Sequence, residues 1–380
     1  MGLIRILLAI CVVAGHSSLI LGLPFLDAGA AVKAFFVISG FYMALILDRK
    51  YDGRTPGGRR LFWSNRFLRI YPPYLATLLF ALLFYAAACW YLHRPADRFE
   101  YWIQAWQEGH YAAFIPLLFS QFSVIGLDLT PAFGFSHAQG FTLLNAGMLT
   151  DTVQAWRFNM LPHAWSISVE LLFYLIAPWL CRWGKRGLLG LVLITIGMKG
   201  MAGWFLPVQL AEALVYHFMP FQIGYFALGI LAYQWRGKLV PSIEYRAISG
   251  AAWGLLIGGV VFGGLAITGR SNMRELAPLL MAIGAPSIFA LSRNWHFDRM
   301  IGELSYSLYL LHVPCKWVLS AVHGSAVKDA VVISGSELLV VSVVASIGMY
   351  FVVERPIDRW RERRIQASGV SRGVDAQTQR

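Results

Sequence analysis

The sequence predicts an all-α fold, a polytopic bundle of transmembrane helices. Of the 380 residues, 57% are hydrophobic and only 14% are charged, whereas soluble proteins carry about a quarter charged residues. Long apolar runs recur along the whole chain, and a helix needs about 20 apolar residues to cross a hydrocarbon core about 30 Å thick. We therefore expect a membrane protein with many spans.

About ten apolar runs are long enough to be predicted spans. Seven arginine and lysine residues lie in or beside the segment 49–69, between the second and third runs, which the positive-inside rule places in the cytoplasm. Both chain termini are then expected in the cytoplasm. The ten runs are residues 3–22, 29–48, 70–91, 163–181, 187–206, 214–234, 247–267, 276–292, 303–322 and 334–353.

Residues 92–162 are predicted to form an external excursion. Their apolar stretches 111–124 and 141–149 are short and interrupted by proline and glycine. A single crossing would put the later basic clusters outside, so either both stretches cross or neither does. We expect neither, and the excursion is interfacial or re-entrant. Residues 1–356 then form one membrane domain, and 357–380 a basic cytoplasmic tail with a disordered end.

Composition also argues against other classes of protein. The net charge of +12 is divided among short clusters between apolar runs, so these clusters indicate topology and no nucleic-acid partner is expected. The four cysteines never approach a C-x-x-C spacing, and neither a disulfide framework nor a metal site is predicted. A signal peptide at 1–21 is disfavoured because no cleavage site of small residues follows its apolar stretch.

The first predicted span contains two basic side chains, Arg5 and His16. Eleven residues apart, they share one helical face and stand about 16 Å apart along the axis. Arg5 also fits a snorkelling anchor at the inner surface. His16 lies deeper, beside two serines, and an ionisable group inside a span predicts a functional role.

Two further polar faces occur in later spans. His163, Ser166 and Glu170 share a face at the start of the fourth, and the alternative is a helix cap with a structural glutamate. Tyr309 and His312 share a face of the ninth with Ser305, where His312 is a second candidate base. The alternative is a polar seam between helices.

Arg66 and Arg69 precede the third span at helical spacing. Two guanidinium groups at i and i+3 can project together and bind phosphate oxygens through bidentate hydrogen bonds. Anionic lipid headgroups would satisfy them equally well.

Taken together, the motifs resemble the acyltransferase 3 family of bacterial integral membrane O-acyltransferases. The matching features are Arg5-x10-His16, Phe35-Phe-Val-Ile-Ser-Gly-Phe41, Arg66-x-x-Arg69 with Pro72, His163-x-Trp165-Ser-x-Ser-x-Glu170, Ser305-Tyr-Ser-Leu-Tyr-Leu-Leu-His312 and Glu354-Arg-Pro356. The resemblance implies transfer of an acyl group, usually acetyl, from a cytoplasmic acyl-CoA to a hydroxyl of an exported or cell-surface carbohydrate. It also implies a bacterial inner membrane, with membrane lipids as neighbours.

The chain departs from this pattern at Lys33, where many relatives carry an acidic or other polar residue, and at Leu171-Leu172, which replaces a commonly polar pair. No SGNH-type esterase domain follows the last span. The resemblance leaves open whether the acceptor is a lipopolysaccharide, an exopolysaccharide, a glucan or a signalling oligosaccharide. The oligomeric state is also open.

The expected mechanism places the phosphates of acyl-CoA near Arg66, Arg69 and Arg5. Neutral His16 acts as the general base on the acceptor hydroxyl, and Glu170 orients it.

Several other residues complete this expected site. Ser39, Tyr309 or a backbone amide near Gly40 binds the oxyanion, and Ser39 is the alternative covalent acyl carrier. The acceptor-binding candidates are His163, Trp165 and Ser166.

Two competing functions fit the same composition. A secondary transporter or flippase for a glycolipid or small anion would also have about ten spans and intramembrane charges, but an internal repeat is not evident. An unrelated MBOAT-type acyltransferase is the second alternative.

Overall fold

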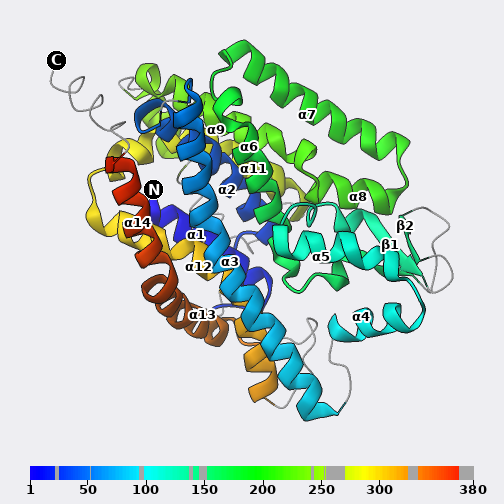
Figure 1. Cartoon of the computed structure of the whole chain (residues 1–380). Coiled ribbons are helices and arrows are strands. Elements are labelled where there is room, and N and C mark those ends of the chain that lie inside the picture. Colours follow the sequence, from blue (N-terminus) through cyan, green and yellow to red (C-terminus); the bar gives the residue numbers. More distant parts are fainter. Residues whose placement is uncertain are drawn as a thin grey trace.

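The computed structural model describes residues 1–21, 25–51, 53–93, 98–136, 140–144, 152–240, 244–251, 253, 270–323 and 333–367 (Figure 1). Its α-helices are α1 (Gly2–Gly15), α2 (Ala28–Arg49), α3 (Pro56–Leu92), α4 (Arg98–Gln107), α5 (Phe114–Ser123), α6 (Trp165–Leu180), α7 (Lys185–Phe205), α8 (Val208–His217), α9 (Met219–Leu239), α11 (Arg270–Ser292), α12 (His296–Val322), α13 (Gly335–Met349) and α14 (Arg355–Ala367). The predicted helical membrane architecture is confirmed.

Seven helices of the described part of the chain are long and apolar enough to cross a bilayer. The apolar helix α1 is shorter, and α12 is not among the seven. Most of the predicted span 247–267 lies outside the described residues. The count of ten spans and the side on which each terminus lies therefore stay predictions.

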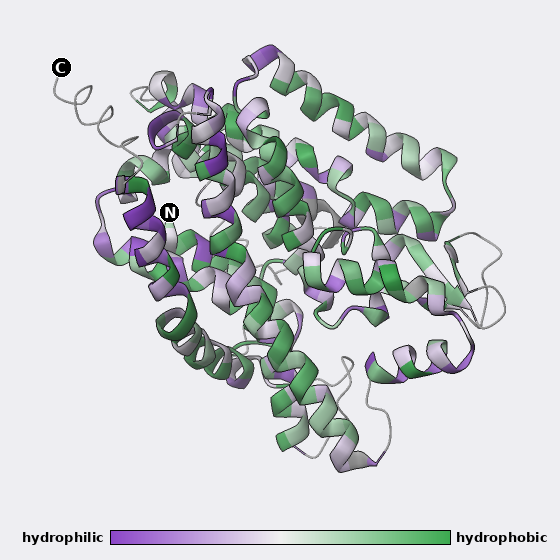
Figure 2. Ribbon diagram, viewed as in Figure 1, coloured by the Kyte–Doolittle hydropathy of each residue, from purple (hydrophilic) through white to green (hydrophobic). Residues whose placement is uncertain are grey.

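The exposed surface of several helices is apolar, as expected of helices that contact lipid. Figure 2 shows hydrophobic residues along much of α3 and α13, whereas α14 is hydrophilic. Large apolar side chains such as Leu83, Ile194 and Val344 are each more than half exposed. Such a surface would be a liability in water, and lipid tails satisfy it.

The first predicted span is wrong at its outer end, because α1 ends at Gly15 rather than continuing to residue 22. The polar residues after it bond to other groups. The hydroxyl of Ser17 donates back to the carbonyl of Val13, and the amide of Ser18 donates to the carbonyl of Ile333 at 2.9 Å. Serine side chains that compete for backbone partners disfavour further helix.

Helix α1 lies inside the bundle, in contact with α2, α12 and α13. A Cβ atom on Gly302 would lie 2.6 Å from the Cα of Gly2, so α1 and α12 can approach this closely only at glycine. Asp298 at the start of α12 accepts the amides of Gly2 and Leu3, each at 2.8 Å. Burial raises the pKa of this carboxyl, but the Met1 ammonium group and these two amides outweigh burial and lower the pKa to about 2.

A second close approach joins α2 to α9. A Cβ on Gly40 would lie 2.1 Å from the carbonyl oxygen of Phe226, and one on Gly229 would lie 2.0 Å from that of Val37. Small residues allow membrane helices to pack backbone against backbone. The motif around Ser39 is thus fixed in place by helix packing.

Among its described residues, the segment 92–162 contains only short elements. Helix α5 has 10 residues and is only about 15 Å long, too short to cross. A small antiparallel sheet of order β2-β1-β3 follows, from β1 (Phe133–Ser136), β2 (Gly140–Leu143) and β3 (Val153–Gln154). In its register Phe135 pairs with Phe141 and with Val153. These three short strands interrupt a chain that is otherwise helical among its described residues.

The residues that follow the last predicted span continue as helix. Helix α13 continues through a π-helical turn (Tyr350–Glu354) directly into α14. Arg364 of α14 donates to Ser64 of α3 at 3.0 Å. Residues 357–367 are therefore helix docked on the bundle rather than a free tail, because α14 has a face that packs on α3. The end predicted to be disordered, 368–380, lies outside the described residues.

Candidate active site

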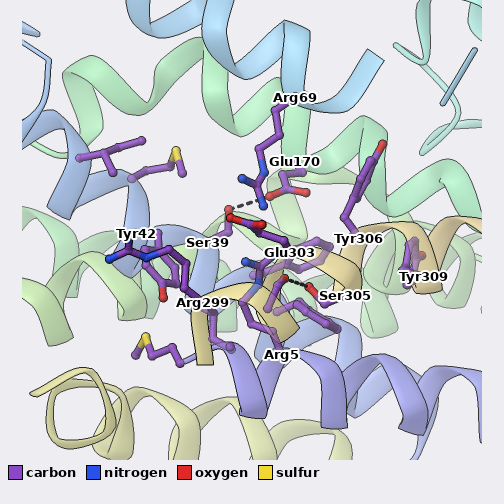
Figure 3. Close-up of a pocket in the computed structure, with 18 of the residues that line it drawn as sticks. Arg5, Ser39, Tyr42, Arg69, Glu170, Arg299, Glu303, Ser305, Tyr306 and Tyr309 are labelled. Carbon is purple, nitrogen blue, oxygen red and sulfur yellow. Dashed lines mark hydrogen bonds between the residues drawn. The ribbon is translucent and has the colours of Figure 1, made fainter. Parts of the chain in front are cut away.

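Two cavities lie within the bundle, and the predicted site residues divide between them. The inner cavity has a volume of about 460 Å³ and is formed by α1, α2, α3, α6 and α12 with the connection between α11 and α12 (Figure 3). The predicted residues that line it are Arg5, Ser39, Arg66, Arg69, Ser166, Glu170 and Tyr309.

The inner cavity is rich in cations without partners. Six cationic side chains line it, against three acidic ones. None of the six forms an ion pair or a side-chain hydrogen bond with any described residue of the chain. Arg5, Arg66 and Arg69 are partly buried, and a charge away from water is stabilised by a partner of opposite charge, so this arrangement predicts an anionic ligand. The six cations are Arg5, Lys50, Arg66, Arg69, Arg293 and Arg299.

The carboxylate of Glu170 projects from α6 into the inner cavity. Its Oε1 accepts hydrogen bonds from Ser39 of α2 at 2.9 Å and from Tyr174, one turn along its own helix. Figure 3 shows Glu170 beside Ser39, with Arg69 reaching the same region from α3. The hydrogen bonds orient the carboxylate, and the arginines offset its charge.

Tyr309 of α12 lies where the helices α6 and α12 meet. Its hydroxyl donates to the carbonyl of His163 at 2.8 Å and lies 2.6 Å from the hydroxyl of Ser166. The tyrosine has one proton, and the His163 carbonyl can only accept. The predicted role of Tyr309 in binding an oxyanion would require this bond to break.

The outer cavity has a volume of about 890 Å³. Predicted residues His16, His163 and Trp165 line it, with Tyr309 at its inner end. The indole of Trp165 packs against the rings of Tyr216 and His217, with centroids 5.2 and 4.7 Å away. The wall combines aromatic faces with polar groups, as binding sites for polar organic ligands do.

The two cavities lie next to each other, because Val32 and Tyr309 line both of them. Arg5 lies on the inner cavity and His16 on the outer one, at opposite ends of α1. Val32 and Tyr309 therefore mark the place where ligands in the two cavities would come closest to each other, and we call this place the junction.

Three histidines from different segments gather beside the junction. The ring centroid of His312 lies 4.8 Å from that of His16 and 5.0 Å from that of His163. One nitrogen of each ring faces a backbone carbonyl, at 2.9 Å for His16 Nδ1, 2.6 Å for His312 Nδ1 and 3.0 Å for His163 Nε2. A carbonyl accepts only, so these nitrogens carry the protons. In neutral His16, Nε2 is then the nitrogen with a lone pair.

Access separates the two candidate bases. His312 is fully buried, lines neither cavity, and its Nε2 makes no hydrogen bond to the described residues. His16 is partly exposed and lines the outer cavity. A general base must come within hydrogen-bond reach of its substrate, and this favours His16.

The predicted pairing of Glu170 with His16 gains no support from the structure. Glu170 lies in the inner cavity with Ser39 and Tyr174, whereas His16 lines the outer cavity and packs on His312. The amide of Gly40 lies within α2, where amides bond to the carbonyl four residues earlier, so it is not available for an oxyanion.

A cluster of paired charges on α2, α7 and α11 was not predicted from the sequence. Lys33 pairs with Glu275 at 2.5 Å, Tyr225 donates to the same carboxylate at 2.5 Å, and Lys199 donates to Tyr225 at 2.5 Å. Lys33 and Glu275 line the outer cavity. The rule that ionisable residues inside spans need partners could have found it, since all three charged residues lie in or beside apolar runs.

Three of the inner cations were also missed. Lys50, Arg293 and Arg299 lie in or beside predicted cytoplasmic connections, where positive charge is expected for topology alone. No group of three metal-ligating side chains occurs among the residues that the structure describes.

Comparison with known proteins gives one match. The model of a family described as an acyltransferase domain matches residues 1–351 of the chain. No curated protein and no solved structure matches it.

Proposed function

The chain belongs to the acyltransferase 3 family, and from this membership we propose that it transfers an acyl group from a cytoplasmic acyl-CoA to a hydroxyl of an exported carbohydrate. The observation that carries the proposal is the inner cavity with its six cations, which meets a second cavity beside a histidine. The first suits a polyanionic donor and the second a neutral, hydroxyl-rich acceptor.

The donor would bind in the inner cavity. Its diphosphate would lie at Arg5, Arg66 and Arg69, because guanidinium groups match phosphate oxygens in bidentate geometry. The pantetheine arm would follow the apolar wall formed by Phe35 and Ile38 towards Val32. The thioester would then reach the junction at Tyr309.

The acceptor would approach from the outer cavity. Its hydroxyl is too weak an acid to ionise at neutral pH, so Nε2 of His16 removes the proton as the oxygen attacks the thioester carbonyl. A carbon–oxygen bond forms and the carbon–sulfur bond breaks. The proton on His16 passes to the departing thiolate, which leaves an ester and free CoA.

The acceptor class and the acyl group follow from the family resemblance. The aromatic wall of Trp165 and Tyr216 supports a sugar acceptor, since pyranose rings pack on aromatic faces. We expect acetyl as the acyl group and the bacterial inner membrane as the location. A transporter would also have two cavities that meet, but it needs neither a thioester donor nor a base at the junction.

Binding of the donor tests this function. The purified protein in detergent is titrated with acetyl-CoA by calorimetry, as wild type and as Arg66→Ala and Arg69→Ala. Loss of a charge-assisted bidentate contact should weaken binding at least tenfold in each variant, and Arg69→Lys should restore only part of it. Arg186→Ala is the matched control, because Arg186 is exposed on α7 and lines neither cavity.

A wild-type protein that binds no acetyl-CoA would overturn the proposal. If both alanine variants bound acetyl-CoA with wild-type affinity, Arg66 and Arg69 would instead be assigned to the binding of lipid headgroups.

A further inference from the structure

We infer that the mouth of the inner cavity is a separate subsite for the 3′-phosphoadenosine end of the donor. The subsite consists of Arg293, Trp295 and Arg299, with Lys50 on the same cavity wall. All four side chains line the cavity and are exposed. The inference rests on the proposed function, because it names the part of the nucleotide that these residues contact.

The cations of the cavity fall into two tiers. Arg5, Arg66 and Arg69 are only partly exposed, on helices α1 and α3. Arg293 and Arg299 are exposed and lie at the connection between α11, which ends at Ser292, and α12, which begins at His296. Arg299 precedes Tyr309 by ten residues of one helix, so the mouth lies about 15 Å from the junction along α12.

Coenzyme A has the same division of charge. Its diphosphate is attached to the pantetheine arm, and a phosphate monoester, with a charge of about −1.5 to −2, is attached to the ribose beyond it. Arg5, Arg66 and Arg69 can hold only the diphosphate, because this is the charged group nearer the thioester. The monoester then falls at the mouth, where Arg293 and Arg299 have no partner among the described residues.

An aromatic face completes the subsite. Trp295 is 66% exposed and makes no ring contact with the described part of the chain. An exposed tryptophan at a cavity mouth between two arginines provides a surface on which an adenine can stack, with the guanidinium groups at the phosphate. A carrier protein that presents only phosphopantetheine would leave both features unused.

A comparison of two ligands tests the subsite. Binding of acetyl-CoA and of 3′-dephospho-acetyl-CoA is measured for the wild type, for Arg293→Ala and Arg299→Ala, and for the control Arg186→Ala. The wild type should prefer acetyl-CoA by about tenfold or more, and each mouth variant should lose most of that preference while it keeps its affinity for the dephospho ligand. The preference should also shrink with added salt, since the mouth is exposed.

The adenine contact has its own readout. Trp295→Ala should lower the affinity for acetyl-CoA and for 3′-dephospho-acetyl-CoA by the same factor. Trp295→Phe should restore the binding of both.

The possible outcomes are distinct. Equal wild-type affinity for the two ligands, or an unchanged preference in both arginine variants, overturns the subsite while the proposed function stands. An arginine variant that binds neither ligand also contradicts the subsite, because in the proposed geometry the dephospho ligand makes no contact with Arg293 or Arg299. A wild type that binds neither ligand overturns the function itself.

Discussion

At the scale of single residues, hydrogen bonds to the backbone decide which nitrogen of an imidazole is basic, and access to a cavity decides which imidazole can act. In His16, Nδ1 faces the carbonyl of Val12, which leaves Nε2 as the basic nitrogen. His312 has the same tautomer but no contact with either cavity. Burial, and not chemistry, therefore distinguishes the two histidines.

Replacement of His16 by alanine should abolish transfer and spare donor binding. A general base contributes about 10² to 10⁴ in rate, so turnover should fall at least a hundredfold while the affinity for acetyl-CoA changes little. The measurements are transfer of labelled acetyl and calorimetric binding. His312→Ala is the control and should keep more activity. If it were instead the inactive variant, His312 would be the base.

The role of Ser39 is also decided at this scale. Its hydroxyl donates to Glu170, a geometry that serves either a covalent acyl carrier or a simple anchor for the carboxylate. For direct transfer we expect Ser39→Ala to lower turnover less than tenfold, with no acyl-enzyme trapped by mass spectrometry after rapid quenching. Complete loss of activity together with a labelled wild-type Ser39 would establish the covalent route.

At the scale of elements, the position of the site depends on glycines that let helices touch. Helix α9 carries two of them in contrasting surroundings: a Cβ on Gly229 would collide with the carbonyl of Val37, whereas one on Gly237 would meet nothing within 4 Å. Gly40 and Gly229 hold α2, and with it Ser39, against α9.

The two glycines of α9 should respond to alanine with opposite signs. Gly229→Ala should lower the free energy of unfolding by about 1 to 3 kcal/mol, because backbone atoms must move apart. Gly237→Ala should raise it by up to about 1 kcal/mol through helix propensity. Thermal unfolding in detergent measures both. Equal stability of the two variants would mean that α2 and α9 are not in close contact.

At the scale of the whole molecule, the meeting of two cavities matters more than either cavity. Among the described residues, Val32 and Tyr309 border both cavities. The transfer step thus depends on how α2, α6 and α12 meet, and it can be blocked without filling the site of the donor phosphates.

A bulky residue at the junction should uncouple binding from transfer. We expect Val32→Phe to lower turnover more than tenfold, while the affinity for acetyl-CoA stays within about threefold, because the junction is apart from the arginines proposed to hold the phosphates, with Arg299 roughly 15 Å away along α12. Val32→Ala is the matched variant and should remain active. Full activity of Val32→Phe would place the reaction elsewhere.

The orientation of the chain is the other property of the whole molecule. In a background without the native cysteines, Gly57→Cys should react with an impermeant maleimide only from the cytoplasmic side, and Glu100→Cys only from outside. Both positions are exposed. Reaction of Glu100→Cys only from the cytoplasm would contradict the external placement of 92–162.

The sequence by itself determined the helical membrane fold and many of the residues that face the cavities, among them Arg5, His16 and Glu170. The length of each apolar run and the positions of the basic clusters between the runs can be read directly from the sequence. The long helices were therefore predictable from local pattern. The end of α1 was not, since Ser18 bonds to the distant residue Ile333. Nor were the sheet after α5, the docking of α14 or the partner of Lys33, which all depend on segments far apart in sequence. Only the tertiary structure separated His16 from Glu170 and brought His312 to His16, because the packing of helices decides which side chains share a cavity.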